Sequence, residues 1–589
     1  MKRTHTCGEL IKADIGKDVV LSGWVQSRRD HGGVIFIDLR DKYGLTQVVF
    51  DPSHNSKVHE KAEHLGREFV LQIKGKVRAR KEGMVNPKLP TGEVEVLVDD
   101  LVILNASETP PMEIDDRKVP SEEVRLKYRY LDLRRPTMQS NFLARHKAMQ
   151  AARQSLVEQG FMEIETPLLV RNTPEGARDY IVPSRVNPGK IYSLPQSPQL
   201  YKQILMVSGF DRYFQLAKCL RDEDLRADRQ PEFTQIDLEM SFVDQEDVWQ
   251  VVENIISNIF EKAFNKKIAT PFKRLTYNES MKKYGTDKPD LRFGLELIDV
   301  TKIFSRSNFS IIKSAIDKGG VVKCINVKGG AKISRKTIDS YIEFVKIYKA
   351  NGLAWMKMND KLESSVVKFF SEDLQSELID KVKAEKGDLL LFVADKKEKI
   401  VNTSLAELRN KLGKDLSLYN PEELNFVWIT DFPLFEWDDD LEQYVPAHHM
   451  FTMPNEDTIN YLESEPGKVI ALCYDLVLNG VELGSGSIRV HRKDIQQRIM
   501  KAMKITEEEA EEKFGFLLEA FRYGAPPHGG FAIGFDRLVA LALGIHDIRE
   551  VIAFPKNKSA QCPMDGCPSS VSNEDLKEVH LRWDIVKKK

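Results

Sequence analysis

The sequence predicts an α+β protein whose strands pair as antiparallel hairpins, and three stretches carry that prediction. Residues 212–242 alternate polar and apolar side chains on either side of a charged loop, which is typical of two antiparallel strands. Asn479-Gly480 lies between two apolar runs and predicts a two-residue hairpin. Residues 529–544 have the pattern of a strand followed by a helix that ends at a glycine.

One face of the strands in 212–242 is densely charged. The opposite face carries Ile236, Leu238, Met240 and Phe242. Such a polar face is either the floor of a site for a charged ligand or a solvated surface with ion pairs. Its charged members are Arg221, Glu223, Asp237 and Glu239.

Length and composition limit the class of protein. A chain of 589 residues predicts several domains, and its net charge of -2 excludes a uniformly basic nucleic-acid binder while permitting local basic patches. Six scattered cysteines form no disulfide framework, and the lone pair Cys562 and Cys567 does not by itself predict zinc. Because no apolar run has the length of a signal peptide or a membrane span, we expect a cytoplasmic protein with no membrane partner.

The N-terminal part predicts a small β-barrel. Five short apolar segments between residues 18 and 105 are typical of the five-stranded oligonucleotide-binding (OB) type. Alternation directs Ile35, Ile37 and Leu39 inward and leaves Phe36 outward with Asp38 and Arg40. An outward aromatic among arginines can stack on an unpaired base, although a single exposed Phe is often without function. The arginines are Arg28, Arg29, Arg78 and Arg80.

The rest of the chain alternates helical and strand-like patterns. Helices are expected at 140–160, 199–208 and 245–266, and the charged, proline-bounded stretch before them is expected to be a hinge. A lysine-rich region of mixed strands and helices predicts an inserted domain. The expected divisions are a barrel (1–107), a hinge (108–136), a first catalytic part (137–290), an insertion (291–423), a second catalytic part (424–556) and a C-terminal extension (557–589).

The predicted hairpin at Asn479-Gly480 brings two carboxylates together. Its turn pairs Val477 with Glu482 and places Asp475 diagonally beside Glu482. Two such carboxylates either repel each other or hold a divalent cation, and Mg²⁺ is the expected ion near a phosphate site. Strict alternation directs Arg489 to the other face, unless a bulge within residues 484–487 restores it.

Arg537 lies in the first turn of the last predicted helix, where a cation opposes the helix dipole. Pairing with Asp536 could compensate it. A bound phosphate would gain from both the arginine and the helix N-terminus, and the sequence favours that interpretation.

Three segments in order resemble the motifs of class II aminoacyl-tRNA synthetases. They are residues 160–167 (motif 1), Arg221-Asp222-Glu223 with the following strand (motif 2) and residues 530–537 (motif 3). TPEGARDY (173–180), LPQSPQLYKQ (194–203), His448-His449 and GVELGSGSIR (480–489) more narrowly resemble bacterial aspartyl-tRNA synthetases, over essentially the whole chain. The resemblance implies an antiparallel catalytic sheet with flanking helices, an OB-type anticodon-binding barrel, an inserted domain and a homodimer.

The same resemblance implies ATP and Mg²⁺ at the catalytic site. Arg221 should hold the α-phosphate and the substrate carboxylate, Arg537 the γ-phosphate, and Glu482 with Asp475 the Mg²⁺. Glu223 should accept from the adenine amino group, Phe233 should stack on the ring, and Gln230 lies in the loop that closes over ATP. The remaining expected ATP contacts are Asp222, Gly534, Phe535 and Asp536.

For L-aspartate, the resemblance implies that Lys202 and Arg489 pair with the side-chain carboxylate and that Asp237 meets the ammonium group. Glu239 and Ser241, on the same face as Asp237, receive no role. The other expected contacts are Glu175, Ser197, Gln199, Arg221, His448 and the adjacent His449.

The barrel bears on the choice of tRNA. At two positions of the barrel, relatives specific for tRNA-Asp resemble one another, with Leu at the first and Lys at the second. This chain has His31 at the first position and Gly83 at the second. Together with Arg29, Phe36 and Gln47, these residues form the expected anticodon surface, and they predict a non-discriminating enzyme that charges both tRNA-Asp and tRNA-Asn. The alternatives are an enzyme specific for tRNA-Asp, an asparaginyl- or lysyl-tRNA synthetase, and a non-catalytic RNA-binding paralogue.

Overall fold

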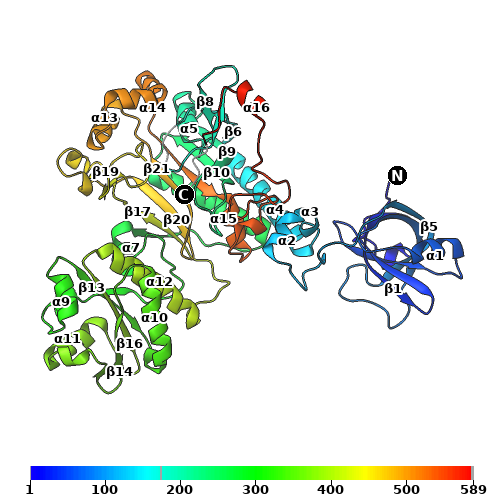
Figure 1. The fold of residues 1–589 in the computed structure, drawn as a ribbon, viewed down its shortest axis with the longest axis horizontal. Helices are drawn as coiled ribbons and strands as arrows, with labels where there is room; N and C mark the ends of the chain where they lie inside the picture. The colour runs from blue at the N-terminus through cyan, green and yellow to red at the C-terminus, as the bar shows by residue number, and fades with distance from the viewer. Residues whose placement is uncertain (1, 173–175, 585–589) are drawn as a thin grey trace. The chain divides into compact units, whose positions relative to one another are not determined.

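The computed structural model describes residues 2–172 and 176–584, which divide into two compact units (Figure 1). The first unit comprises the residues up to Leu143 together with Ile552–Ser569. The second comprises Ala144–Val551 and the residues from Ser570 onward.

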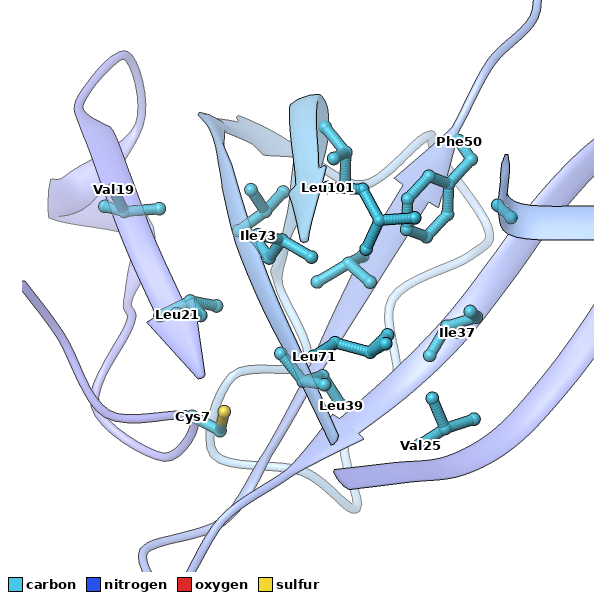
Figure 2. Close-up of a cluster of buried hydrophobic side chains, with 14 of the residues drawn as sticks. Cys7, Val19, Leu21, Val25, Ile37, Leu39, Phe50, Leu71, Ile73 and Leu101 are labelled. Atoms are coloured by element: carbon cyan, nitrogen blue, oxygen red, sulfur yellow. The ribbon is translucent and has the colours of Figure 1, made fainter. Parts of the chain in front are cut away.

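The N-terminal barrel is closed and has five strands, as predicted. Its order is β1-β2-β3-β5-β4, and helix α1 (Ser56–Glu63) lies between β3 and β4 in the chain. Residues at alternate positions, such as Val19, Leu21, Ile37 and Leu39, fill its interior (Figure 2). The strands are β1 (Asp18–His31), β2 (Val34–Arg40), β3 (Leu45–Phe50), β4 (Val70–Ala79) and β5 (Val94–Asn105).

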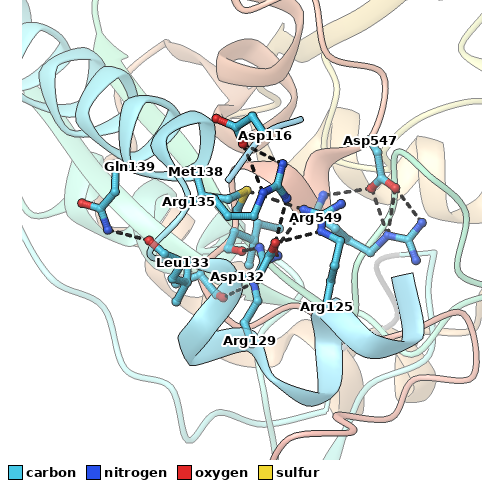
Figure 3. Close-up of polar contacts among 12 residues, drawn as sticks. Asp116, Arg125, Arg129, Asp132, Leu133, Arg135, Met138, Gln139, Asp547 and Arg549 are labelled. Carbon is cyan, nitrogen blue, oxygen red and sulfur yellow. Dashed lines mark hydrogen bonds and ion pairs between the residues drawn. The ribbon is translucent and has the colours of Figure 1, made fainter. Parts of the chain in front are cut away.

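The stretch expected to be a hinge is partly folded. Helices α2 (Glu122–Lys127) and α3 (Arg129–Asp132) lead into α4 (Pro136–Glu158). Asp132 is fully buried and accepts from Arg125 (3.0 Å), Arg129 (2.6 Å) and Arg135 (2.8 Å) (Figure 3). Three arginines of the charged stretch that was expected to be a hinge therefore pair with one buried carboxylate.

An eight-stranded sheet forms the centre of the second unit and confirms the predicted antiparallel arrangement. Among the described strands of this sheet, only the outermost pairs, β11 with β17 and β9 with β6, are parallel. Its order is β11 (Lys273–Thr276), β17 (Phe426–Thr430), β20 (Cys473–Leu478), β21 (Val481–Ile488), β22 (His528–Gly534), β10 (Glu232–Ser241), β9 (Arg212–Leu220) and β6 (Met162–Glu163).

Helix α6 (Gln245–Phe264) covers one face of this sheet. Asp244 caps its N-terminus by accepting from the backbone amides of Glu246 and Asp247, and Asn265 ends it in the left-handed conformation. Val248, Val252, Ile255, Ile259 and Phe260 form a buried apolar stripe on this helix, and Trp249 packs on Trp428 of β17. Further helices of this unit, apart from those of the predicted insertion, are α5 (Gln199–Val207), α7 (Tyr277–Tyr284), α13 (Lys493–Ala502), α14 (Glu507–Ala520), α15 (Phe535–Ala542) and α16 (Asn573–Glu578).

Part of the predicted insertion forms a second, five-stranded sheet between two layers of helices. Helices α10 (Arg335–Ile347) and α12 (Glu398–Asp415) share one apolar core with it, and helices α8 (Thr301–Ser305), α9 (Ser310–Ile316) and α11 (Glu372–Val382) share another. Its strands in order are β12 (Leu297–Asp299), β13 (Val321–Val327), β16 (Leu389–Asp395), β14 (Ala354–Met358) and β15 (Leu362–Glu363).

Two small ladders, β7 (Ile181–Pro183) with β8 (Ile191–Ser193) and β18 (Phe435–Asp438) with β19 (Gln443–Pro446), complete the strands. None of the helices in the described parts of the chain combines the length and the apolar character needed to cross a membrane.

Candidate active site

The polar face of strands β10, β20, β21 and β22 floors a cavity of about 540 Å³ in the second unit. The cavity gathers side chains from segments that lie up to about 350 positions apart in the chain, from Ser197 to Ile548. The lining includes these expected site residues: Ser197, Gln199, Lys202, Arg221, Glu223, Gln230, Phe233, Asp237, His448, His449, Glu482, Arg489, Gly534, Asp536 and Arg537.

Three charged residues of the lining, Lys202, Asp237 and Arg489, form a buried cluster with Glu239. Lys202 Nζ lies 2.6 Å from Asp237 Oδ1 and 3.3 Å from Glu239 Oε2. Arg489 donates through Nε and Nη2 to the two oxygens of Glu239, at 2.9 and 3.2 Å. The solvated-surface alternative is therefore wrong, because each of these side chains is at most 4 % exposed. We call Lys202, Asp237, Glu239 and Arg489 the buried quartet.

The pKa values of the two carboxylates in the quartet shift in opposite directions. Burial raises the pKa of Asp237 to about 6, even though Lys202 opposes the shift. Burial also acts on Glu239, but the charges of Arg489 and Lys202 outweigh it and lower the pKa of that carboxyl. Glu239 is thus the constant anion that fixes both cations, and Asp237 is the carboxylate whose charge is costly.

Close packing of neighbouring strands leaves room for Glu239. Gly530 on β22 lies opposite Glu239 on β10, and a Cβ atom at position 530 would lie 2.0 Å from Glu239 Oε2. A glycine at this position is therefore required by the buried carboxylate.

A β-bulge brings Arg489 to the same face as the carboxylates. Asn479 and Gly480 both have positive φ (52° and 84°) and form the predicted turn, with Val477 opposite Glu482. The register then shifts so that Leu476 pairs with Gly484, which makes Leu483 the extra residue. The predicted bulge exists, but it precedes residues 484–487.

The other end of the cavity is rich in arginine. The guanidinium of Arg221 lies 5.1 Å from the centre of the Phe233 ring. Arg537 Nη1 donates to the carbonyl of Glu482 (2.7 Å), and Nη2 lies 3.3 Å from Asp228 in the β9–β10 loop. Glu223 accepts from Arg229 of the same loop at 2.9 Å.

Several cavity residues carry polar atoms that have no hydrogen-bond partner within the described protein. They include Asp237 Oδ2, Arg221 Nε and Arg537 Nε, all buried. Because a buried, unpaired polar atom is costly, their presence in one cavity indicates a ligand that supplies a donor to Asp237 and acceptors to the arginines.

Glu482 and Asp475 are not equivalent in the structure. Glu482 lines the cavity, and its Oε2 is 2.8 Å from Lys288 Nζ. Asp475 is buried outside the lining, 3.6 Å from His448 Nε2, and its Oδ1 has no partner among the described residues. Burial and the charge of Glu482 raise the pKa of Asp475, whereas Lys288 lowers the pKa of Glu482 against the effect of burial.

Both adjacent histidines line the cavity. Burial would lower the pKa of His448, but the hydrogen bond and charge of Asp475 raise it. Burial and the nearby Arg489 and Lys202 lower the pKa of His449 to about 3. His449 is therefore a neutral imidazole, in agreement with its Nδ1 accepting from the amide of Phe451 at 3.2 Å.

Some expected site residues lie outside the lining, and Asp536, although part of it, pairs with residues behind the cavity wall. Phe535 is fully buried outside the lining, beneath the guanidinium of Arg145, and Asp536 is turned to Arg145 (2.5 Å) and the amide of Thr234 (2.7 Å). Asp222 lines a neighbouring pocket, and Glu175 lies outside the described residues. The alternative in which Asp536 compensates Arg537 does not hold, because Asp536 pairs with Arg145.

Phe242 and Ser241 also depart from the simple alternation. Phe242 follows the end of β10 with a φ of 58° and is 72 % exposed, so it does not face the core. The hydroxyl of Ser241 donates to Met206 Sδ at 3.2 Å and does not line the cavity.

The first unit carries a polar network on the outside of the barrel. Arg29 donates to Asp38 (3.0 Å) and to Gln47 (3.2 Å), and Gln47 donates to Glu95 (2.7 Å). Phe36 pairs directly with Arg29 across strands β1 and β2 and is partly exposed, as predicted.

Three other barrel residues complete this picture. His31 ends strand β1 and Gly83 lies in the β4–β5 loop with a φ of 78°, and both are exposed. The expectation that Arg40 points outward is wrong, because it is 8 % exposed and pairs with Glu68 at 2.8 Å.

Sequence reasoning missed three residues of these networks. Glu239 was on the recognised polar face, but its partners come from other segments. Lys288 follows α7 in a connector with no periodic pattern, and Glu95 joins Gln47 to Arg78 (2.8 Å) from a strand whose other buried members are mostly apolar. A buried Glu in an apolar strand was the one available signal.

Comparison with known proteins identifies the family. A family model for "tRNA synthetases class II (D, K and N)" matches residues 121–558, and one for "OB-fold nucleic acid binding domain" matches residues 19–104. The chain belongs to the class II tRNA synthetases. This synthetase is 54 % identical over 586 residues to a protein of Thermoanaerobacter sp. (strain X514) named Aspartate--tRNA(Asp/Asn) ligase, with 99 % of each chain covered.

Other relatives match over similar lengths. A protein of Aquifex aeolicus with the same name is 53 % identical over 594 residues, covering 99 % of this chain and 98 % of its own. A protein of Macrococcus caseolyticus named Aspartate--tRNA ligase is 52 % identical over 585 residues, covering 99 % of both.

Solved structures share the fold. The structure of asparaginyl-tRNA synthetase from Pyrococcus horikoshii complexed with asparaginyl-adenylate aligns with a TM-score of 0.59 at 20 % identity, over 94 % of this synthetase and 98 % of that chain. A putative aspartyl-tRNA synthetase from Leishmania major aligns with a TM-score of 0.60 at 19 % identity, over 94 % of each chain.

Proposed function

We propose that this synthetase activates L-aspartate with ATP and transfers the aspartyl group to the 3′ end of tRNA-Asp and tRNA-Asn. The buried quartet carries the proposal, because it offers two fixed cations and one unsatisfied carboxylate oxygen in the same enclosed space. Relatives that are more than half identical over the full length and named as Asp/Asn ligases support it.

The quartet suits aspartate by charge and by hydrogen bonding. Lys202 and Arg489 would pair with the side-chain carboxylate, while the free Oδ2 of Asp237 would accept from the ammonium group. Asparagine would place a neutral amide before two buried cations, and a lysine side chain would place a cation there; both leave charges uncompensated. This argues against the asparaginyl- and lysyl-specific alternatives.

The arginine-rich end suits ATP. Phe233 offers a ring for adenine, Glu223 an acceptor, and Arg221 and Arg537 have unsatisfied donors for phosphate oxygens. Gly534 and Gln230 complete that part of the wall. We include Asp222 as a more distant contact, and we assign Phe535 and Asp536 to support of the helix that holds Arg537.

The acidic pair fits Mg²⁺ by donor type, because both offer carboxylate oxygens and Asp475 Oδ1 is unsatisfied. Glu482 at the wall and Asp475 behind it would hold the ion. When bound, Mg²⁺ supplies positive charge to the phosphates.

The chain's own residues then act mainly by positioning. The quartet orients aspartate so that its α-carboxylate faces the α-phosphate, and Arg221 spans the two groups. As the carboxylate oxygen attacks and pyrophosphate leaves, Arg221 and Arg537 neutralise the charge on the phosphates. No strong base is required, which agrees with His449 being neutral and with His448 being engaged by Asp475.

We propose the barrel as the anticodon-binding surface. Phe36 would stack on a base while Arg29, Gln47 and the newly found Glu95 offer donors and acceptors to base edges. A small residue at Gly83 and a flat imidazole at His31 would admit either third anticodon base, and the Asp/Asn names of relatives support this choice.

We further propose a cytoplasmic homodimer. Exposed apolar side chains around the motif 1 segment support dimerisation, because such a patch is costly in water. They are Val157 (60 %), Met162 (55 %), Leu168 (50 %) and Leu169 (52 %). The domain divisions expected from the sequence stay part of this proposal.

Aminoacylation with purified tRNA-Asp and tRNA-Asn tests the function directly. We expect aspartate to be attached to both tRNAs, and ATP–pyrophosphate exchange to depend on aspartate but not on asparagine or lysine. Arg537→Ala should lose exchange while retaining tRNA binding. Charging of tRNA-Asp alone would establish the discriminating alternative, and tRNA binding without exchange in the unmodified protein would establish a non-catalytic paralogue.

A further inference from the structure

Cys562 and Cys567 close a tight loop in the first unit. The amide of Cys562 donates to the carbonyl of Cys567 (2.8 Å), and the amide of Gly566 donates to the carbonyl of Cys562 (2.9 Å). Gly566 has a φ of 78°, which the turn requires and which favours glycine. The two cysteines are therefore adjacent in space although four residues separate them in the chain.

Asp565 lies between the two thiols. Its Oδ1 accepts from the amide of Cys567 at 3.0 Å, which fixes the carboxylate, and both thiols hydrogen-bond to it. The two Sγ atoms and one carboxylate oxygen all lie within 4.8 Å of one another. Sulfur ligands of one tetrahedral zinc ion are about 3.8 Å apart, so a small contraction would suffice.

The chain before the loop is also held in place. Asn557 accepts through Oδ1 from the amide of Gln561 (3.0 Å), and its own amide donates to the carbonyl of Gln561 (2.8 Å). The donors are thus arranged before any ion arrives, which reduces the entropy lost on binding.

We propose that Cys562, Asp565 and Cys567 form a binding site for a thiophilic divalent cation of the zinc class. Two sulfurs select a soft or borderline cation over Mg²⁺, which prefers oxygen ligands. Binding would release the two thiol protons to solvent and replace them by one M²⁺ shared between two thiolates and the carboxylate. Three protein ligands leave a fourth position for water, and Asp565 is exposed, so the ion can enter from solvent.

The site would act as a structural link. Arg129 of α3 donates to the carbonyls of Ile552 and Ala553, both at 2.9 Å, in the same unit. The returning segment is therefore tied to α3 at its start, and the ion would close the loop at residues 562–567. The proposal is independent of aspartylation, because none of the three ligands lines the catalytic cavity.

Cadmium binding to the full-length, reduced protein tests the proposal, because cadmium–thiolate bonds give a charge-transfer absorption band. We expect one thiolate-bound Cd²⁺ per chain, displaced by excess Zn²⁺. Cys562→Ser and Cys567→Ser should each lose the band, and Asp565→Asn should weaken binding about tenfold or more. Zn²⁺ should raise the melting temperature of the unmodified protein. The rise should be smaller in Cys567→Ser.

Cys473 provides the matched control, since its thiol lies near His448 and Asp475 in the catalytic cavity. Cys473→Ser should keep the band. A band lost in Cys473→Ser and kept in Cys562→Ser would overturn the proposal. So would the absence of any band from the reduced, unmodified protein.

Discussion

Arg489 and Glu239 form a buried two-point ion pair, through Nε and Nη2 at 2.9 and 3.2 Å. The arginine expected to read the substrate is thus held by a carboxylate that belongs to the protein. Lys202 is held by the same carboxylate at 3.3 Å. The position of both cations, and not only their charge, is therefore set before aspartate binds.

Glu239→Gln should lower kcat/KM for aspartate by about two orders of magnitude, since removing one partner of a buried charge pair typically costs about 2–5 kcal/mol. The two cations would lose their common anchor and repel each other. The KM for ATP should change little. Pyrophosphate exchange at varied aspartate concentration measures this, with Ser241→Ala on the same strand as the control. Equal losses in both variants would show that the strand, rather than the carboxylate, is at fault.

Aspartate binding should weaken at acid pH because of Asp237. The pKa of this carboxyl is raised to about 6, so it is ionised above that pH and protonated below it. Only the ionised form accepts from the substrate ammonium. KM for aspartate should therefore rise about tenfold per pH unit below the pKa. The raised pKa also means that the charged form opposes folding as the pH rises through about 6, and the bound ammonium relieves this cost.

Asp237→Asn checks that assignment. The variant should bind aspartate weakly at every pH and lose the acid-side inflection. A profile that keeps its inflection in the variant would place the titrating group elsewhere.

Lys288→Met should strengthen the binding of Mn²⁺, a probe for Mg²⁺, to the protein without ATP. The ammonium group lies 2.8 Å from Glu482 and competes with any cation for that carboxylate. Because Lys288 is 41 % exposed, the gain should be only a few-fold. Calorimetric titration measures it, and Lys283→Met, whose Nζ lies 3.8 Å from Glu296, is the control. Unchanged Mn²⁺ affinity would contradict the competition.

Asp132→Asn should destabilise the first unit by about 3–5 kcal/mol, because three arginines would lose their shared buried anion. Although burial raises the pKa of Asp132, the arginines lower it overall. Its contribution is therefore present at neutral pH and lost as the pH falls through that lowered value. Denaturant unfolding followed by tryptophan fluorescence measures the effect. Asp115→Asn, which breaks a pair with the exposed Arg117, should cost less than about 1 kcal/mol.

Local pattern predicted much of the fold. Strands β9 and β10, the β20–β21 turn and helix α6 follow from periodicity and turn chemistry, which act over a few residues. Periodicity also placed Asp237 and Glu482 on the correct face. It could not place Arg489, because the extra residue at Leu483 inverts the alternation and no local signal fixes the position of a bulge.

Long-range partners explain the remaining differences. The role of Glu239 depends on Lys202 and Arg489, which lie 37 positions before it and 250 positions after it. Asp536 was the local alternative partner for its neighbour Arg537, yet its own partner Arg145 lies 391 positions away. Residues 125–135 have the composition of a solvated linker. Only the fold shows that three of their arginines pair with Asp132.

Gly530 has a consequence for how amino-acid choice is encoded. Its lack of a Cβ leaves the volume that the Glu239 carboxylate fills, so a methyl group there would displace the anion that fixes both cations. Substrate preference would then change through a position that has no side chain and reaches no ligand. A survey that ranks residues by their distance from bound aspartate would pass over it, although even Gly530→Ala would rebuild the pocket.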